Sequence, residues 1–216
     1  MSQPCFSISH AESIEYHLIG NKKANLHNTV INLRWQPPHS NTYKLNTDES
    51  CAANPGKEGI GGVIRNSKGD WVMGFNKSFT HATNNLMELM ALREGLTLDL
   101  YHKIKPLTVE VDSMEILNMF HRGNPLYDSI VNACRFLLES LKNSPVQYIY
   151  REQNRVADML AKQGSEKDLF DRLRVYVTPP ANVGVVFWED LEGKTISQSI
   201  NAQHVANQSS FIFAPG

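Results

Sequence analysis

The stretch Tyr43–Cys51, which reads YKLNTDESC, has the pattern of a β-strand that carries an acidic residue, Asp48, towards its end. A second and shorter β-pattern, Leu107–Val111, is followed directly by Asp112. In open α/β sheets, functional sites lie at the edge that the strand ends form. These two acids therefore predict a site at one edge of a sheet.

Two further acids, Glu88 and Asp158, lie in or beside the first turn of helical patterns. Strand ends and helix starts can converge at one sheet edge. Carboxylates gathered there would repel one another unless a divalent cation neutralised them. Hard oxygen ligands suit Mg²⁺ or Mn²⁺, and two such ions can clamp a phosphodiester for hydrolysis.

Each acid also has a purely structural interpretation. Asp48 is then a solvated strand end, Asp112 a helix cap, and Glu88 or Asp158 a charge that the dipole of a first helical turn favours. Two features favour a site instead. Asp48 and Asp112 both end apolar strands, and Asp48 is followed by a second acid, Glu49, whose charge is unfavourable there unless something cationic lies nearby.

The region from Tyr43 to about Ser165 changes between the periodicities of strands and helices. The predicted strands are Tyr43–Cys51, Gly59–Asn66, Trp71–Ser78, Leu107–Val111 and Val146–Tyr150. An apolar helical stripe runs from Leu89 to Leu100, with Asn84 or Asn85 placed to cap its start, and further helical patterns follow at 113–120, 130–141 and 155–163. The order βββαβααβα predicts an α/β fold with a five-stranded mixed sheet flanked by helices.

The segments on either side of this region lack sustained periodicity. Residues 1–42 end in a segment that contains Pro37-Pro38, and consecutive prolines favour an extended, solvated linker. Beyond residue 165, Pro179-Pro180 interrupts a weak pattern and leaves apolar patches at Val183–Trp188 and Phe211–Phe213. We therefore expect an N-terminal extension and linker at 1–42, a domain at 43–165, and a peripheral, partly ordered C-terminal extension at 166–216.

Composition and charge exclude some classes of function. The chain has 216 residues, 41% of them hydrophobic, and a formal charge of −1, unlike a strongly basic, non-specific nucleic-acid binder. Cys5, Cys51 and Cys134 form no CxxC pair, which argues against a structural zinc site or a disulfide framework and fits a reducing compartment. Without a signal-peptide core or an apolar run of membrane-spanning length, we expect an intracellular monomer, in the nucleus or the cytoplasm, with no membrane partner.

Four motifs occur in a fixed order. They are Thr47-Asp48-x-Ser50-Cys51, Thr83-Asn84-Asn85-x-Met87-Glu88, Val111-Asp112-Ser113 and Asn154-x-x-Ala157-Asp158-x-Leu160-Ala161. Their order and spacing resemble those of cellular-type ribonuclease H. The stretch Tyr150–Asp158 is especially similar to the ribonuclease-H-like domains of plant proteins and non-LTR retroelements. Tyr176–Pro180 also looks like the tail of those plant proteins.

The resemblance implies a ribonuclease-H-like fold and a Mg²⁺-dependent endonuclease that cuts the RNA strand of an RNA–DNA hybrid. Asp48 would bridge two metal ions, and Glu88 and Asp112 would hold one of them. Asp158 would hold the ion that activates water, and Mn²⁺ would be an alternative cofactor.

The resemblance also implies positions that contact the nucleic acid. Asn84 and Asn85 match positions whose amides meet base edges and sugar hydroxyls in the minor groove, and Cys51 and Asn54 match positions near the RNA backbone. Such short polar groups can contact the 2′-hydroxyl that distinguishes RNA from DNA. Helix capping and turn formation are the alternative interpretations of the three asparagines.

Several features depart from the family pattern. Glu49 stands where a glycine usually follows the first aspartate, and the loop Tyr150–Asn154 lacks the histidine that active members often carry. The basic substrate-gripping helix of bacterial members is replaced by Arg122–Pro125. Basic and acidic residues between 43 and 165 are equal in number, so affinity for a polyanion should be weak and metal-dependent. Two alternatives therefore stay open: a catalytically weak or inactive nucleic-acid-binding module of retroelement origin, and the detached C-terminal domain of an RNA-directed polymerase.

Overall fold

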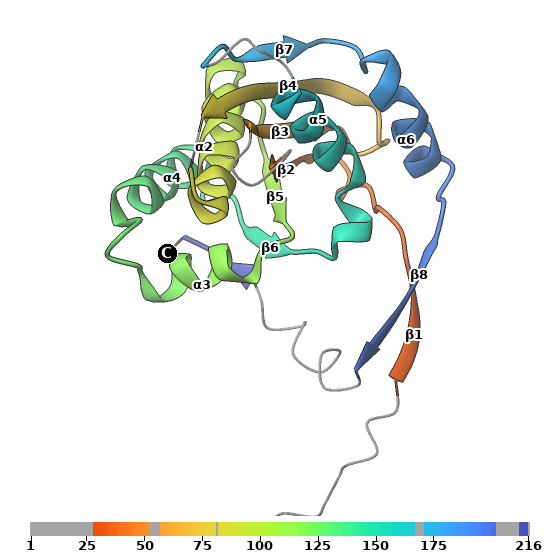
Figure 1. Ribbon diagram of the computed structural model, residues 1–216, viewed down its shortest axis with the longest axis horizontal. Coiled ribbons are helices and arrows are strands. Elements are labelled where there is room, and N and C mark those ends of the chain that lie inside the picture. Colours follow the sequence, from red (N-terminus) through yellow and green to blue (C-terminus); the bar gives the residue numbers. More distant parts are fainter. Residues whose placement is uncertain (1–27, 52–56, 81, 167–170, 202–211, 216) are drawn as a thin grey trace, which may run out of the picture.

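A mixed sheet forms the centre of the protein (Figure 1). The computed structural model describes residues 28–51, 57–80, 82–166, 171–201 and 212–215. In this part of the chain, five long or central strands are β2 (Tyr43–Cys51), β3 (Lys57–Arg65), β4 (Trp71–Thr80), β5 (Leu107–Val111) and β6 (Val146–Tyr148). β3 pairs antiparallel with β2 and β4, whereas β5 is parallel to both β2 and β6.

Helices cover both faces of this sheet (Figure 1). They are α2 (Asn84–His102), α3 (Met114–Arg122), α4 (Asp128–Ser140), α5 (Arg155–Ser165) and α6 (Ala181–Leu191). Strand alternation separates two cores: Ile64 packs with α2, α3 and α4, and its neighbour Val63 packs with α5 and α6. Both faces of the central strands are therefore buried, and this burial includes polar side chains such as Asn46 and Glu110.

α5 lies unusually close to the sheet because two glycines of β3 face it. A Cβ atom added to Gly61 would lie 2.2 Å from the backbone nitrogen of Ala161, and one added to Gly59 would lie 2.2 Å from that of Ser165. Any side chain at either position would push the helix away. The two glycines thus fix the height of α5 above the sheet.

The predicted fold class and the order βββαβααβα are confirmed, with two differences. Short strands β7 (Arg174–Tyr176) and β9 (Ile212–Phe213) extend the sheet to seven strands among the described residues, in the order β7-β4-β3-β2-β5-β6-β9. The cap of α2 is Thr83, whose side chain accepts from the backbone N–H of Leu86, and not Asn84 or Asn85. Thr83 extends one residue ahead of the helix, where the first N–H groups need an acceptor.

Segments outside residues 43–165 make buried contacts with that region. Trp35 is only 4% exposed, and its indole Nε1 donates to Asn46 Oδ1 at 3.0 Å. Asp190 of α6 forms a buried ion pair of 2.9 Å with Arg65. Division into an N-terminal extension and linker, a domain and a C-terminal extension at residues 42 and 165 stays a prediction, but contacts cross both boundaries.

A second, two-stranded sheet joins the two extensions. β1 (Asn28–Leu33) pairs antiparallel with β8 (Ile196–Asn201), and Figure 1 shows this ribbon extending away from the main sheet. Among the described helices, none combines the length and the apolar character needed to cross a bilayer.

Candidate functional site

Three of the predicted acids converge at one end of the sheet. Asp48 lies in β2, Asp112 directly follows β5, and Glu88 lies in the second turn of α2. One carboxylate oxygen from each of the three lies within 4.8 Å of the others. Strand-end placement predicted this convergence. Whether the three carboxylates hold metal ions stays a prediction.

Asp48 and Glu88 are buried and Asp112 is half-buried, with little compensating charge. Asp48 is 3% exposed and Glu88 is 8% exposed. Burial, and then the nearby charges of Asp112 and Asp158, raise the pKa of Asp48 well above its ordinary value. Burial and the charges of Asp48 and Asp112 raise the pKa of Glu88 in the same way. The cluster therefore disfavours full ionisation of these acids when no cation is bound.

The donor set fits a hard divalent cation. Asp48 Oδ2 and Glu88 Oε2 are buried, and neither accepts a hydrogen bond from any described residue. Buried polar atoms are normally satisfied, so these two oxygens lack a partner that a bound cation could supply. Mg²⁺ and Mn²⁺ prefer carboxylate oxygens of this kind.

Asp158 lies beside the cluster, in the first turn of α5. Lys162 Nζ approaches its Oδ2 to 2.6 Å, and Arg151 NH2 lies 3.6 Å from its Oδ1. Its charge raises the pKa of Asp48, so the two carboxylates are electrostatically coupled. The structure thus brings three predicted ligands together and holds the fourth nearby between two cations.

A short loop between β6 and α5 is hydrogen-bonded to the site. It contains one turn of 3₁₀-helix, Arg151–Gln153, followed by the buried residue Asn154. Asn154 Nδ2 donates to the carbonyl of Thr47 at 2.8 Å, and its side chain also bonds to Asp112. Burial raises the pKa of Asp112, while Arg151 and this hydrogen bond lower it. Asn154 was part of a motif found in the sequence. Its bridge between Thr47 and Asp112 was not predicted, because it depends on contacts between segments far apart in the chain.

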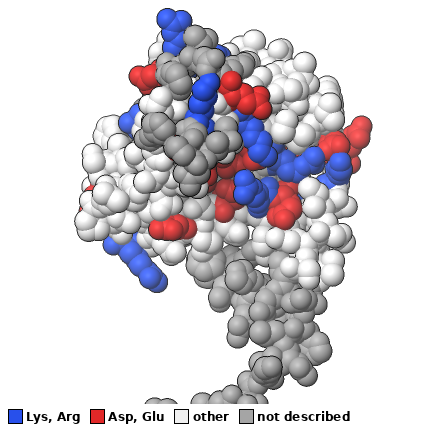
Figure 2. Space-filling view, viewed as in Figure 1, with Lys and Arg blue, Asp and Glu red and all other residues white. Residues whose placement is uncertain are grey.

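The acids line a cleft of about 260 Å³. Its walls are formed by Asp48, Glu49, Glu88, Asp112, Ser113, Tyr148, Tyr150, Arg151, Glu152 and Gln198. Arg151 is the one cationic residue among these described lining residues. Figure 2 shows acidic side chains gathered in the middle of this face with basic side chains directly beside them. Sequence reasoning missed Gln198, because nothing local connects β8 with Asp48, Glu88 and Asp112, which lie more than eighty residues earlier in the chain.

Glu49 is part of this cleft. It follows Asp48 on β2, and both residues line the cleft. Burial raises the pKa of Glu49, Arg151 lowers it, and the carboxylates of Glu58, Asp112 and Asp158 raise it further. The site thus contains an additional half-buried acid at the position where the family usually has glycine.

The predicted nucleic-acid contacts are only partly placed. Asn84 is exposed and Asn85 is half-buried at the start of α2, and Cys51 is exposed at the end of β2. Asn54 lies outside the described residues. The substrate role of these residues stays a prediction.

Comparison with known sequences identifies the family. Residues 46–164, more than half of the chain, match the sequence profile of the reverse transcriptase-like family. The chain belongs to this family. An Arabidopsis thaliana member named "Putative ribonuclease H protein" is 32% identical over 131 residues, which are 59% of this chain and 21% of that protein. The chain thus spans about a fifth of the relative's length.

Solved structures show that this reverse transcriptase-like chain has the ribonuclease-H-like fold. RNase H1 from the archaeon Halobacterium salinarum matches with a TM-score of 0.52 and 22% identity, over 58% of this chain and 98% of that one. LC11-RNase H1, isolated from compost and solved in complex with an RNA/DNA hybrid, matches with a TM-score of 0.52 and 26% identity, over 57% and 96% of the two chains. The resemblance to ribonuclease H that the motifs indicated is confirmed.

Proposed function

We propose that this protein is a metal-dependent ribonuclease that hydrolyses the RNA strand of RNA–DNA hybrids with two divalent ions. The observation that carries the proposal is the convergence of the Asp48, Glu88 and Asp112 carboxylates within 4.8 Å of one another. The similarity to a protein named for ribonuclease H, and to one solved with an RNA/DNA hybrid, supports this substrate class.

Asp48, Glu88, Asp112 and Asp158 would hold the ions, with Mg²⁺ as the expected metal and Mn²⁺ as an alternative. When bound, such ions lower the pKa of the attacking water and neutralise charge that develops on the leaving oxygen. The partnerless oxygens Asp48 Oδ2 and Glu88 Oε2 are the donors best placed for this role.

Other residues of the site position these acids and the substrate. Asn154 holds the Asp112 carboxylate against β2 through its bond to the Thr47 carbonyl. Arg151, whose side chain is mostly exposed, brings a positive charge to the mouth of an otherwise acidic cleft. A guanidinium placed there can bind a phosphate of the incoming strand, which the acids alone would repel.

We propose that the nucleic acid is also contacted by the exposed polar side chains near the cleft. Asn84 and Asn85 at the start of α2, Cys51 at the end of β2, and Asn54 are the candidates. Short polar side chains of this kind suit the 2′-hydroxyls of an RNA strand in a shallow minor groove.

One specific observation favours a second function, a nucleic-acid-binding module with weak or no turnover. Asp158 is already ion-paired with Lys162 and Arg151. This pairing opposes a second metal ion, because the two cationic side chains compete with it for the carboxylate.

A cleavage assay distinguishes the two functions. The full chain is incubated with a labelled RNA–DNA hybrid in Mg²⁺ and in Mn²⁺, beside the Asp48→Asn variant and a matched DNA duplex. Cleavage of the RNA strand by the wild type alone supports the ribonuclease. Binding of the hybrid without cleavage in either metal supports the binding module and contradicts the proposed activity.

A further inference from the structure

The β1–β8 ribbon is attached to the domain beside the acidic cleft. On β1, Leu33 is buried and Ile31 is half-buried, and both pack against Tyr148 and Tyr150. Val30 and Asn32, which alternate with them, are exposed. One face of the ribbon therefore contacts the tyrosines that line the cleft, and the other face is open to solvent.

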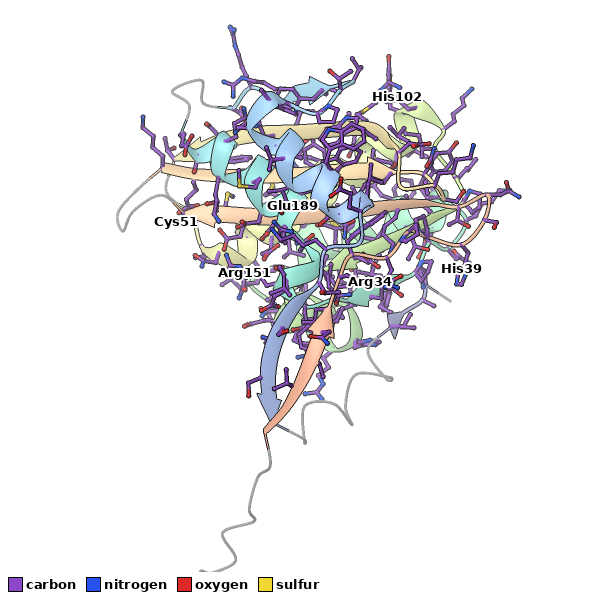
Figure 3. The ribbon with its side chains drawn as sticks, turned by 90° about the vertical axis from the view of Figure 1, so that its right-hand side faces the viewer. Arg34, His39, Cys51, His102, Arg151 and Glu189 are labelled. Atoms are coloured by element: carbon purple, nitrogen blue, oxygen red, sulfur yellow. The ribbon has the colours of Figure 1, made fainter. Side chains whose placement is uncertain are left out.

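A hydrogen bond strengthens this attachment at the base of the ribbon. Gln153 Nε2, in the loop that carries Arg151, donates to the carbonyl of Arg34 at 2.9 Å. Figure 3 shows Arg151 and Arg34 near the place where the ribbon leaves the domain. The ribbon, the loop and the two tyrosines are thus held together on one side of the cleft.

Gln198 is the polar exception on the inward face of β8. Its backbone partner is Ile31, and it is half-buried like Ile196, whereas Ser197 and Ser199 between and beyond them are exposed. Gln198 lines the same cleft as Asp48 and Asp112. Its Oε1 is buried and accepts no hydrogen bond from the described part of the chain.

An unpartnered amide oxygen in an acidic cleft requires a hydrogen-bond donor. Phosphate oxygens only accept, so a phosphate cannot satisfy this atom. A ribose 2′-hydroxyl both donates and accepts hydrogen bonds. It can therefore bond to the Gln198 amide whether the oxygen or the nitrogen of that amide faces the cleft. Tyr148 and Tyr150, whose ring centroids lie 5.9 Å apart, line the cleft with Gln198, and the ribbon packs against them.

We propose that the β1–β8 ribbon forms an additional wall of the substrate cleft and that Gln198 contacts a 2′-hydroxyl of the RNA strand. This inference rests on the proposed function, because it assumes that the cleft receives an RNA–DNA hybrid. It assigns a selective contact for RNA to an element outside the region that matches the family, residues 46–164.

Binding rather than cleavage tests the contact. Affinities of the full chain for a fluorescent RNA–DNA hybrid and for the matched DNA duplex are measured by anisotropy in Ca²⁺. Gln198→Leu should weaken hybrid binding about fivefold to tenfold, the range for one neutral hydrogen bond, and leave duplex binding unchanged. Ser199→Ala, at the exposed neighbouring position on the same strand, should change neither affinity.

Hybrids with a single 2′-deoxy substitution locate the contact. In the wild type, one substitution near the cleft should weaken binding by a similar factor, and that penalty should disappear in Gln198→Leu, because the two changes remove the same bond. Gln198→Asn keeps the amide but shortens the side chain, so it should give an intermediate loss of hybrid affinity. This variant also serves as a control in case Gln198→Leu misfolds.

The inference is overturned if Gln198→Leu leaves hybrid affinity unchanged, if hybrid and duplex weaken equally, or if every deoxy penalty survives in the variant. The proposed ribonuclease activity fails separately. If the wild type binds hybrid through Gln198 but cleaves it in neither Mg²⁺ nor Mn²⁺, the proposed contact is supported and the proposed activity is contradicted.

Discussion

Two pairs of polar residues, two positions apart along β2 and β5, differ in how far neighbouring groups compensate their buried charges. Asn46 and Glu110 are paired neighbours on β2 and β5, and Asp48 and Asp112 follow two residues later on each strand. Glu110 is buried, but its carboxylate forms an ion pair with Lys44 Nζ at 2.5 Å. It also accepts hydrogen bonds from the side-chain amides of Asn46 on β2 and Gln147 on β6.

Asp48, at the end of the sheet, has no comparable set of partners. Asp48 Oδ2 bonds to no described residue, and the nearest charges in its surroundings are mostly other carboxylates. Burial of an acid is therefore not by itself a sign of a site. Clustered acids whose oxygens lack partners are a sign, because the protein retains a cost in stability that only a ligand would offset.

The largest expected effect comes from removing the charge of Asp48. Asp48→Asn should lower hybrid cleavage by roughly a thousandfold, since it removes the acid best placed to hold both ions. In metal-free buffer the same variant should unfold at a higher temperature, because one charge leaves a repulsive cluster. Cleavage assays and thermal melts measure the two effects, and near-wild-type turnover would show that Asp48 is not the central ligand.

Breaking the compensated pair should have the opposite effect on stability. Lys44→Met leaves Glu110 buried without its cation and should lower the free energy of unfolding by about 3 kcal/mol. The double variant Lys44→Met with Glu110→Gln should recover much of this loss, because no uncompensated charge remains. Urea denaturation of the wild type, Lys44→Met, Glu110→Gln and the double variant measures the coupling. Equal stability of Lys44→Met and wild type would mean that Glu110 does not depend on Lys44.

Asp99 of α2 isolates the effect of burial without clustering. It is fully buried, neither of its carboxylate oxygens has a described partner, and burial alone raises its pKa well above the ordinary value. A raised folded-state pKa favours folding below the unfolded-state pKa, and this contribution is lost as the pH rises through the folded-state pKa.

Asp99→Asn should therefore raise the free energy of unfolding at neutral pH by about 1 kcal/mol and have little effect near pH 4. Urea denaturation across this pH range measures the difference. Glu139→Gln, at an exposed position on α4, is the control for the loss of a carboxylate. A gain that is the same at every pH would contradict the titration of Asp99.

The smallest expected effect concerns metal preference. Glu49 adds a half-buried acid to the cleft, which should disfavour the rigid octahedral shell of Mg²⁺ more than it disfavours Mn²⁺. We expect a higher cleavage rate in Mn²⁺, and Glu49→Gly should raise the Mg²⁺ rate a fewfold. Glu49→Gln separates the effect of charge from that of size. Unchanged cleavage rates in both variants would show that Glu49 does not affect the metal preference.

Local patterns predicted the parts of this protein that depend on short segments. Asp48 lies towards the end of β2 and Asp112 directly follows β5, and the parallel pairing of the two strands brings these positions together, so the proximity of these two acids followed from two short patterns. The stripe from Leu89 to Leu100 predicted α2 for the same reason.

Contacts between distant segments were not predictable in this way. The sequence around Pro37-Pro38 indicated a solvated linker, but Trp35 just before it is buried between Asn46 and Arg65, whose guanidinium lies 3.5 Å from the ring. The apolar patch Val183–Trp188 was visible, but nothing local showed that it packs on Val63. Pairing of β1 with β8 likewise depends on residues more than 160 positions apart.

The glycines of β3 have a consequence for how this site withstands mutation. Where Gly61 meets Ala161, backbone touches backbone, so no change of side-chain rotamer can alter the spacing between sheet and helix. A substitution at Gly59 or Gly61 would therefore displace α5 and, with it, the Asp158 carboxylate in the first turn of that helix.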